Sequence, residues 1–340
     1  MCFDEESEGR PAMRNGGMFM STVKWAIIGP GGIAREFSEA IQKIGGTLYA
    51  VGSRSLDKAQ QFAEEYGAAK AYGDYNEMLR DPEIDAVYVS TPHSNHYEYI
   101  IESLKQGKHV LAEKAITVNI GQLREIAALA EEKGLVVAEA MTIYHMPLYT
   151  KLRQIVESGK IGPLKMIQVS FGSHKEYDVN NRFFNKDLAG GALLDIGTYA
   201  LSFARFFLSA QPNEILTTVK PFETGVDEQS GILLKNAADE MAVVSLTMRA
   251  KMPKRGVVAG EQGFITVDNF PRASKAVIQY LDGTSETVEA GNTDEAIQYE
   301  IKDMEQAIAA GASGTLQLSL DVMEIMSNVR GQWGITYPFE

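Results

Sequence analysis

The sequence predicts an α/β protein with two domains: a doubly wound parallel sheet, followed by an α+β domain with a large, mainly antiparallel open sheet. Its 340 residues exceed the length at which a single hydrophobic core usually stops growing. Short apolar runs alternate with helical stretches in the first part of the chain, as in βαβ units. In the second part, strand-like runs follow one another with only turns between them, which favours antiparallel pairing.

The first domain is expected at residues 23–144, after a flexible extension at residues 1–22. Its predicted strands are nearly all apolar, as expected when helices cover both faces of a sheet. The strands are the runs 24–29, 47–53, 85–92, 108–114 and 135–140, and the helices are 32–46, 56–67, 95–107 and 121–134. In the first helix, Ile33, Phe37 and Ile41 recur at helical spacing and would bury one face against the sheet.

The second domain is expected at residues 145–340. Its predicted helices are the stretches 151–159, 192–208, 295–310 and 316–331. Its predicted strands are the runs 163–173, 214–222, 230–236, 241–250, 255–269 and 275–283. The last two helices can pack back on the first domain.

Composition and charge argue against several classes of function. The net charge of -13 and the pI near 5.0 disfavour a nucleic-acid partner, because such binding depends on clustered Lys and Arg that neutralise phosphates. No apolar run is long enough to span a membrane, so no membrane partner is expected. Cys2 is the only cysteine, which excludes an intrachain disulfide and favours a reducing, cytoplasmic location.

A glycine-rich loop between the first predicted strand and helix indicates a dinucleotide site. Gly29, Gly31 and Ala34 form a G-x-G-x-x-A pattern, with Gly32 and Ile33 at the start of the helix. The first glycine allows a tight turn, the second lets the backbone approach a pyrophosphate, and the small third residue lets helix and strand pack closely. The start of the helix supplies partial positive charge. With its βαβ surroundings, this loop predicts a Rossmann domain.

The end of the second predicted strand indicates which dinucleotide binds. In a domain that binds NAD, an Asp or Glu there usually bonds the ribose hydroxyls. This chain has Ser53 and Arg54 instead, with Lys58 one helical turn later. A hydroxyl and a planar guanidinium suit a phosphate. The sequence therefore favours NADP, with NAD as the alternative.

Several motifs in a fixed order resemble those of a known family. They are "GPGGIA", "STPHSNH", "AEKA", "GGALLDIGTY" and the closing "YPFE". Together they resemble the glucose–fructose oxidoreductase, inositol dehydrogenase and rhizopine-catabolism (Gfo/Idh/MocA) family, from about Lys24 to Glu340. The chain is most similar to the glucose–fructose oxidoreductase and trans-dihydrodiol dehydrogenase branch, because Tyr199 stands where inositol dehydrogenases carry histidine. That branch uses NADP, in agreement with Ser53 and Arg54.

The resemblance also implies the catalytic residues. The family's Glu-Lys-Pro motif corresponds to Glu113, Lys114 and Ala115. The resemblance therefore implies that Lys114 approaches the nicotinamide ribose and the reacting oxygen, and that Glu113 has a supporting role on the side of the cofactor. Ala115 replaces the usual proline, which leaves the backbone conformation there open. Its second catalytic element falls on Asp195 and Tyr199, whose spacing would place both on one stripe of a helix. We expect Tyr199 to act as acid and base, Lys114 to lower its pKa, and Asp195 to orient a substrate hydroxyl or hold Lys114.

Histidines and a polar loop complete the predicted site. Thr91, Pro92, His93 and His96 follow a strand end, so they should border the cofactor. The 5 histidines show no helical metal-binding pair, so no metal site is expected.

A polar loop before Gly190 and Gly191 carries candidates for the substrate pocket. These are His174 and Arg182.

The predicted function is an NADP-dependent oxidoreductase that moves hydride between nicotinamide and a CH–OH or carbonyl group. The expected substrate is a sugar, polyol or cyclic trans-diol. Two alternatives remain within the family: a non-catalytic dinucleotide-binding regulator, and a glycosidase that uses bound NAD. Since the antiparallel sheet needs its outer face covered, the resemblance further implies a homodimer or homotetramer formed through that sheet.

Overall fold

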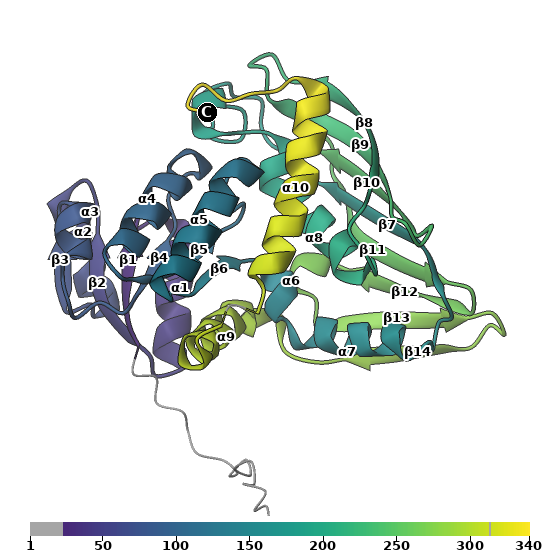
Figure 1. The fold of residues 1–340 in the computed structure, drawn as a ribbon, viewed down its shortest axis with the longest axis horizontal. Helices are drawn as coiled ribbons and strands as arrows, with labels where there is room; N and C mark the ends of the chain where they lie inside the picture. The colour runs from purple at the N-terminus through teal and green to yellow at the C-terminus, as the bar shows by residue number, and fades with distance from the viewer. Residues whose placement is uncertain (1–22, 313) are drawn as a thin grey trace, which may run out of the picture.

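The computed structural model describes residues 23–312 and 314–340, so the predicted extension at residues 1–22 lies outside the described part. Two sheets lie beside one another, each with its own helices (Figure 1). The first sheet occupies the purple and blue half of the ribbon, and the second forms the green edge on the other side. The predicted fold class is confirmed, whereas the domain boundary at residue 144 stays a prediction.

Within the described residues, the first sheet has six parallel strands in the order β3-β2-β1-β4-β5-β6. They are β1 (Lys24–Ile28), β2 (Thr47–Gly52), β3 (Lys70–Tyr72), β4 (Ala86–Val89), β5 (His109–Glu113) and β6 (Val137–Ala140). The chain runs from β1 outward to β3 and then returns to β4 on the other side of β1. Open α/β sheets bind ligands at such a reversal, in the crevice outside the carboxyl ends of the strands.

Helices connect these strands and cover the sheet. They are α1 (Gly32–Lys43), α2 (Leu56–Tyr66), α3 (Tyr75–Leu79), α4 (His93–Lys105) and α5 (Ile120–Lys133). In α1, Phe37 and Ile41 are fully buried against the sheet, as their spacing predicts. Helix α2 begins where the Ser55 side chain accepts a hydrogen bond from the Lys58 amide. Strand β3 and helix α3 are absent from the sequence-based prediction, because each is too short to show a period.

The second sheet, as far as the structure describes the chain, has eight strands in the order β14-β13-β12-β11-β7-β10-β9-β8. They are β7 (Leu164–Gly172), β8 (Glu214–Pro221), β9 (Asp227–Lys235), β10 (Met241–Thr247), β11 (Met252–Gly260), β12 (Gly263–Asp268), β13 (Lys275–Tyr280) and β14 (Ser285–Glu289). Strands β7 and β10 pair in parallel, and the other neighbours pair antiparallel. The sheet is therefore mainly antiparallel, as predicted.

Most of the remaining helices lie between the two sheets or at their junction, whereas α7 packs beside β14 at the far end of the second sheet (Figure 1). They are α6 (Thr142–His145), α7 (Pro147–Glu157), α8 (Thr198–Phe207), α9 (Ala296–Ala310) and α10 (Leu316–Trp333). Helix α9 packs on α1, and Trp25 Nε1 donates to Glu305 Oε1 at 3.0 Å. Helix α10 packs on α5, where the Ile120 amide donates to Ser327 Oγ at 2.9 Å. The two C-terminal helices thus contact the first sheet's helices and hold the halves together.

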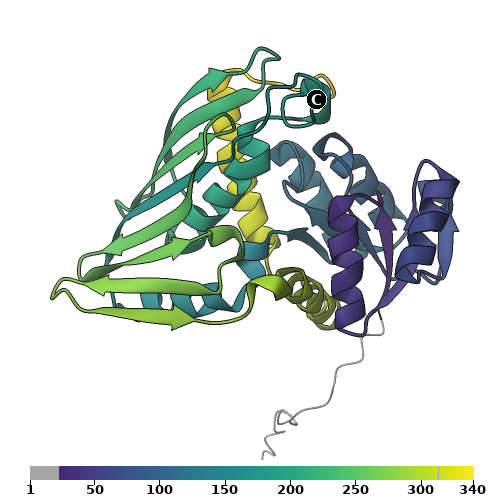
Figure 2. The ribbon, with the colours of Figure 1, turned by 180° about the vertical axis from the view of Figure 1, so that it is seen from behind.

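One face of the second sheet is open. Leu216, Leu233 and Val243 are neighbours across β8, β9 and β10, and they point away from the buried row of Leu234 and Ala242. Leu216 is 66% exposed. Figures 1 and 2 show the described helices on the inner face of this sheet only. None of the described helices is both long and apolar enough to cross a membrane.

Candidate active site

Three loops meet at the carboxyl ends of β1, β4 and β5. The Gly29 amide donates to Gly52 O at 3.3 Å, and Ser90 Oγ donates to Gly29 O at 2.8 Å. A Cβ atom built on Gly29 would lie 2.9 Å from the Thr91 methyl carbon. The glycine loop is therefore packed directly against the loop after β4, at the reversal of strand order.

The geometry of the glycine loop fits a dinucleotide pyrophosphate. Gly29 has φ of +90°, a conformation that glycine adopts readily and other residues rarely adopt. A Cβ on Gly31 or Gly32 would meet nothing within 4 Å, so neither glycine is required by contacts within the protein. Gly31 precedes α1, whose first amides receive no side-chain cap. Thr91 Oγ1 is buried beside this loop and has no hydrogen-bond partner among the described residues, and Ala34 is fully buried where α1 meets the sheet.

The end of β2 presents two exposed cations next to a hydroxyl that already accepts a hydrogen bond. Ser53 is buried, and its Oγ accepts a hydrogen bond from the Ser55 amide at 3.3 Å. Arg54 and Lys58 are exposed. The exposed Arg54 side chain is therefore accessible to a phosphate, whereas Ser53 Oγ already accepts a hydrogen bond in the turn into α2.

Lys114 is the centre of the predicted catalytic group. Its Nζ donates to the Asp195 backbone oxygen at 2.9 Å and to Asp195 Oδ1 at 3.3 Å. The same nitrogen lies 4.9 Å from the centre of the Tyr199 ring. The peptide bond between Lys114 and Ala115 is cis, which settles the backbone conformation that the sequence leaves open. The structure thus brings together residues more than 80 positions apart in the chain, as predicted.

The helix that carries Asp195 differs from the predicted one. A regular α-helix through residues 192–208 would place Asp195 and Tyr199 on one stripe, but residues Leu193–Gly197 form a π-helical turn before α8. Such turns contain one extra residue per turn and are frequent at functional sites. The predicted regular helix is therefore interrupted at Asp195, but Asp195 and Tyr199 still lie on one side of it, because both side chains reach Lys114.

Burial and charge set the protonation of this group. Burial lowers the pKa of Lys114, but Asp195, Tyr199 and Glu113 together outweigh it, so the pKa is raised and the ammonium persists. Burial acts to raise the pKa of Asp195, but Lys114 and Arg182 outweigh it, so the pKa of Asp195 lies below its ordinary value. Lys114 and Asp195 therefore form an ion pair whose side chains are only 15% and 11% exposed.

The predicted lowering of the Tyr199 pKa by Lys114 is outweighed by the effect of burial. Burial raises the pKa of the Tyr199 phenol to about 12, although the Lys114 ammonium acts to lower it. Glu113 also acts to raise it. Lys114 therefore acts in the predicted direction, but the net pKa is raised and not lowered, because desolvation of the phenol is the larger effect.

The histidines of the loop after β4 hold the catalytic turn. The His93 ring nitrogens lie 3.1 Å from Lys114 O and 3.3 Å from Ala189 O. The His96 ring nitrogens lie 3.0 Å from Ala115 O and 2.7 Å from Thr91 O. Burial lowers the pKa of His93 to about 3 and also lowers the pKa of His96, so both rings are neutral.

These contacts distinguish the two histidines. His96 is fully buried and holds the backbone at Thr91 and Ala115. His93 is only partly buried, and Pro92 is exposed.

Glu113 is turned into the protein. Its Oε1 accepts a hydrogen bond from the Tyr88 hydroxyl, and the Tyr88 ring stacks on Phe37 at 3.9 Å between centroids. Burial raises the pKa of Glu113. Its carboxylate therefore links the end of β5 to Tyr88 of β4, next to Lys114. The predicted contact of Glu113 with the cofactor stays a prediction.

The two candidates from the polar loop differ in position. Arg182 Nη1 lies 3.8 Å from Asp195 Oδ1, whereas His174 is exposed. Lys254 of β11 belongs to no sequence motif, and its Nζ lies 4.9 Å from the centre of the Phe171 ring, which itself lies 6.2 Å from the Tyr199 ring. Only the pairing of distant strands brings Lys254 to this site, so no local signal could have identified it. Among the described residues, no group of three or more His, Cys, Asp or Glu could hold a metal ion.

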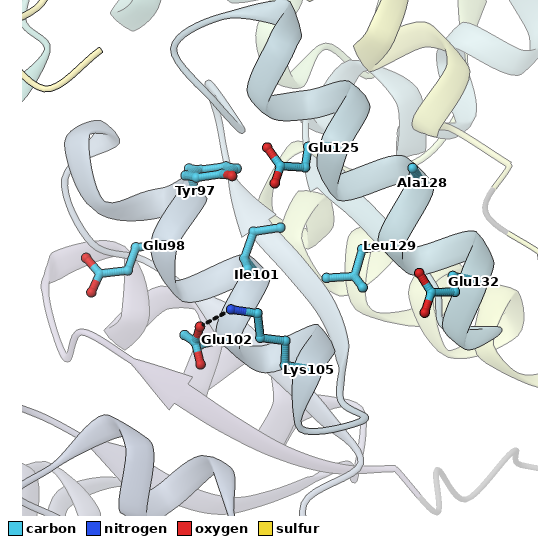
Figure 3. A pocket seen from close by; sticks show the side chains of 9 residues that line it. All are labelled: Tyr97, Glu98, Ile101, Glu102, Lys105, Glu125, Ala128, Leu129 and Glu132. Atoms are coloured by element: carbon cyan, nitrogen blue, oxygen red, sulfur yellow. Dashed lines mark hydrogen bonds and ion pairs between the residues drawn. The ribbon is translucent and has the colours of Figure 1, made fainter.

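A separate hollow of about 540 Å³ lies between α4 and α5 (Figure 3). Its walls carry Glu98, Glu102, Glu125 and Glu132, and Lys105 pairs with Glu102 at 2.7 Å. This excess of carboxylates would repel the phosphates of a dinucleotide. None of the predicted site residues lines it, so this hollow is separate from the predicted site at the strand ends.

Known proteins are similar to this chain over most of its length. The trans-1,2-dihydrobenzene-1,2-diol dehydrogenase of Xenopus laevis is 32% identical, with 93% of this chain and 99% of the relative covered. The NADP(+) D-xylose 1-dehydrogenase of Hypocrea jecorina is 30% identical, with 93% of each chain covered. The solved structure of KijD10, a 3-ketoreductase from Actinomadura kijaniata in complex with NADP and TDP-benzene, matches with a TM-score of 0.82 and 26% identity, covering 91% of this chain and 97% of that one.

Family models match both halves. Residues 23–141 match the oxidoreductase family with an NAD-binding Rossmann fold, and residues 149–266 match the GFO/IDH/MocA C-terminal domain. The predictions of a nicotinamide cofactor and of an oxidoreductase are therefore confirmed. The chain belongs to the GFO/IDH/MocA family of oxidoreductases.

Proposed function

We propose that this enzyme transfers hydride between NADP and a CH–OH or carbonyl carbon of a sugar, polyol or cyclic trans-diol. The observation that carries the proposal is the convergence of Lys114, Asp195 and Tyr199 at the end of β5. A carbinol–carbonyl interconversion requires one group that exchanges a proton with the oxygen and benefits from a cation that stabilises charge there. The names of the diol and xylose dehydrogenases support this class of substrate.

The three side chains take separate roles in this proposal. When bound, NADP supplies or accepts the hydride at its nicotinamide ring. Tyr199 donates its phenolic proton to a carbonyl oxygen during reduction and takes a proton back during oxidation. Its pKa of about 12 keeps the phenol protonated at neutral pH, which suits reduction. Lys114 stabilises negative charge on the reacting oxygen, and Asp195 holds Lys114 and can accept a hydrogen bond from a substrate hydroxyl.

The proposed cofactor site follows the strand ends. Gly31 and Gly32 let the backbone approach the pyrophosphate at the start of α1. The exposed cations Arg54 and Lys58 favour a 2′-phosphate, and the absence of an acid at this position disfavours NAD. Thr91, whose hydroxyl lacks a protein partner, can donate to the cofactor.

The proposal also includes an assembly and a location. Apolar side chains on the open face of the second sheet, among them Leu216, Leu233 and Val243, support a homodimer or homotetramer formed through that face. The single cysteine, Cys2, supports a reducing, cytoplasmic location.

A screen with matched cofactors tests the proposed function. Aldoses, ketoses, dicarbonyls and trans-diols are assayed with NADPH or NADP and, in parallel, with NADH or NAD. We expect turnover of at least one polyhydroxylated compound, with the higher kcat/KM for the phosphorylated cofactor. A preference for NADH would contradict the roles of Arg54 and Lys58, and a failure of every compound to change nicotinamide absorbance would contradict the reaction itself.

A further inference from the structure

Three cations, Lys114, Arg182 and Lys175, act on the carboxylate of Asp195 at the catalytic centre, and a fourth, Lys254, acts on Lys175. Lys114 bonds the Asp195 carboxylate directly, and Arg182 Nη1 lies 3.8 Å from its Oδ1. The charge of Asp195 acts to raise the pKa of Lys175, and the charges of Arg182, Lys114 and Lys254 act to lower it. The carboxylates of Asp195 and Glu113 both act on Lys114, so these four cations outnumber the two carboxylates and the centre carries an excess of positive charge. In a chain with a net charge of -13, such an excess is a local feature that the overall composition does not produce.

Aromatic rings hold the three outer cations, Lys175, Arg182 and Lys254, in place. Lys175 Nζ and Arg182 Cζ each lie 4.1 Å from the centre of the same ring, that of Phe183. Lys254 Nζ lies 4.9 Å from the centre of the Phe171 ring. Cation–π contacts of this kind orient a cation without neutralising it. The outer cations therefore keep their charge available for a ligand.

The backbone of Lys175 is fixed as well. Its amide donates to Met248 O at 2.8 Å, and its carbonyl oxygen accepts from Arg249 Nη1 at 2.5 Å. Two hydrogen bonds on one residue of a polar loop reduce the entropy that a ligand contact would otherwise cost. Lys175 is thus prepared to bind before a ligand arrives.

The two outer lysines differ from a lysine of the same sheet, Lys165, in having no carboxylate partner among the residues that the structure describes. Lys165, on the same strand as Phe171, pairs with Glu261 at 2.9 Å, as a surface lysine in an acidic chain is expected to do. Within the described residues, neither Lys175 nor Lys254 forms an ion pair within 4 Å. Burial and the neighbouring cations lower the pKa of Lys175, so an incoming anion would relieve this repulsion.

We infer that the substrate carries an anionic group, a carboxylate or a phosphate ester, which Lys175, Arg182 and Lys254 bind beside the reacting carbon. The inference rests on the proposed function, because it identifies the substrate class of the same site. The cations come from the loop after β7 and from β11 of the second sheet, whereas the glycine loop that fits the pyrophosphate follows β1 of the first sheet. They therefore select the substrate and not the cofactor.

Binding to the enzyme saturated with NADP tests the inference. The ligands are D-glucose, D-glucuronate and D-glucose 6-phosphate, titrated by calorimetry, so that the two anions distinguish a carboxylate from a phosphate. We expect one anion to bind at least about tenfold more tightly than glucose, because charge-assisted bonds are the strong ones. This advantage should fall as KCl is raised, whereas the affinity for glucose should not.

Variants assign the effect to the cluster. Lys175→Gln and Arg182→Gln should each remove most of the advantage of the anion and leave the affinity for NADP unchanged, while Lys175→Arg should retain it. Lys165→Gln removes the same charge outside the cluster and should have no effect. Equal binding of glucose and both anions, no binding of any of them, or an advantage that survives in both Gln variants would overturn the inference.

The same titrations separate this inference from the proposed function. Tight anion binding without any nicotinamide turnover would contradict the reaction and leave the anion site standing. Turnover of neutral sugars together with equal binding of all three ligands would leave the reaction standing and contradict the anion site.

Discussion

At the scale of single residues, the surroundings of Tyr199 decide its chemistry. A free tyrosine has a pKa near 10, and a nearby ammonium lowers it. The sequence identifies Lys114 as this neighbour, and the structure places it 4.9 Å from the ring. Burial is the larger effect, however, and raises the pKa to about 12. The depth of burial depends on how α8 packs against the second sheet, which no local motif records.

Replacement of Arg54 should change the choice of cofactor. Arg54→Ala removes the planar cation proposed to bind the 2′-phosphate, so NADPH should bind at least tenfold more weakly, as expected for a bond to a charged group of about 1.5–3 kcal/mol. NADH, which lacks that phosphate, should bind within about twofold of its original affinity. Fluorescence titration of both cofactors measures this, with Lys133→Ala at the exposed end of α5 as the charge-matched control. An equal loss for both cofactors would mean that Arg54 does not recognise the phosphate.

At the scale of elements, the site depends on irregular pieces between regular ones. The glycine loop, the cis peptide after Lys114 and the π-helical turn at Leu193–Gly197 are all local departures from helix or strand. The sequence predicts the first from its glycines. The sequence leaves the backbone conformation at Ala115 open. It does not predict the π-helical turn, because the extra residue of such a turn leaves no period in the pattern of apolar residues.

Two glycines of the first loop should respond differently to alanine. Gly29→Ala places a side chain at φ of +90° and 2.9 Å from the Thr91 methyl, so the melting temperature should fall by a few degrees. Gly31→Ala meets nothing within 4 Å of protein, so the melting temperature should hold while the affinity for NADP falls at least about tenfold. Thermal melts with and without NADP separate the two effects. Unchanged NADP affinity in Gly31→Ala would show that the pyrophosphate does not approach there.

Asp227 anchors the start of the π-helical turn and should make stability depend on pH. Its Oδ2 accepts from the Leu193 amide at 2.6 Å, and burial raises its pKa to about 7. Since this folded pKa lies above the ordinary value of 3.8, the folded state binds more protons between these values. The contribution of Asp227 is therefore fully present below about pH 4 and is lost as the pH rises toward 7.

Replacement of this carboxyl isolates its effect. Asp227→Asn cannot ionise, so its free energy of unfolding should fall less between pH 5 and pH 8 than that of the original protein. Urea unfolding at several pH values measures the difference. Parallel curves for the two proteins would show that Asp227 does not titrate in this range.

At the scale of the whole molecule, the site exists only because two sheets meet. Lys114 comes from the end of the first sheet, and Asp195 and Tyr199 come from the helix that covers the second. The sequence predicts both sheets and these three residues, since each belongs to a local motif. It does not predict that Lys254 joins them, because its position depends on the register of β11 against β7.

The open face of the second sheet should control assembly. Leu233→Glu combined with Val243→Glu places two charges among apolar neighbours on this face, so a dimer or tetramer formed through it should dissociate. Light scattering after size exclusion measures the mass against the 37.3 kDa of one chain. Gln60→Glu, exposed on α2, is the control. A monomeric original protein, or an unchanged mass in the double variant, would argue against assembly through this sheet.

Single-turnover hydride transfer by Tyr199→Phe tests the central claim most directly. The variant keeps the ring but removes the proton, and is measured with saturating NADPH and the best carbonyl substrate from the screen, with Tyr97→Phe as control. If Tyr199 exchanges the proton with the reacting oxygen, the rate should fall at least about 100-fold, with NADPH affinity within about twofold of the original. A Tyr199→Phe enzyme that transfers hydride at nearly the original rate would contradict the account.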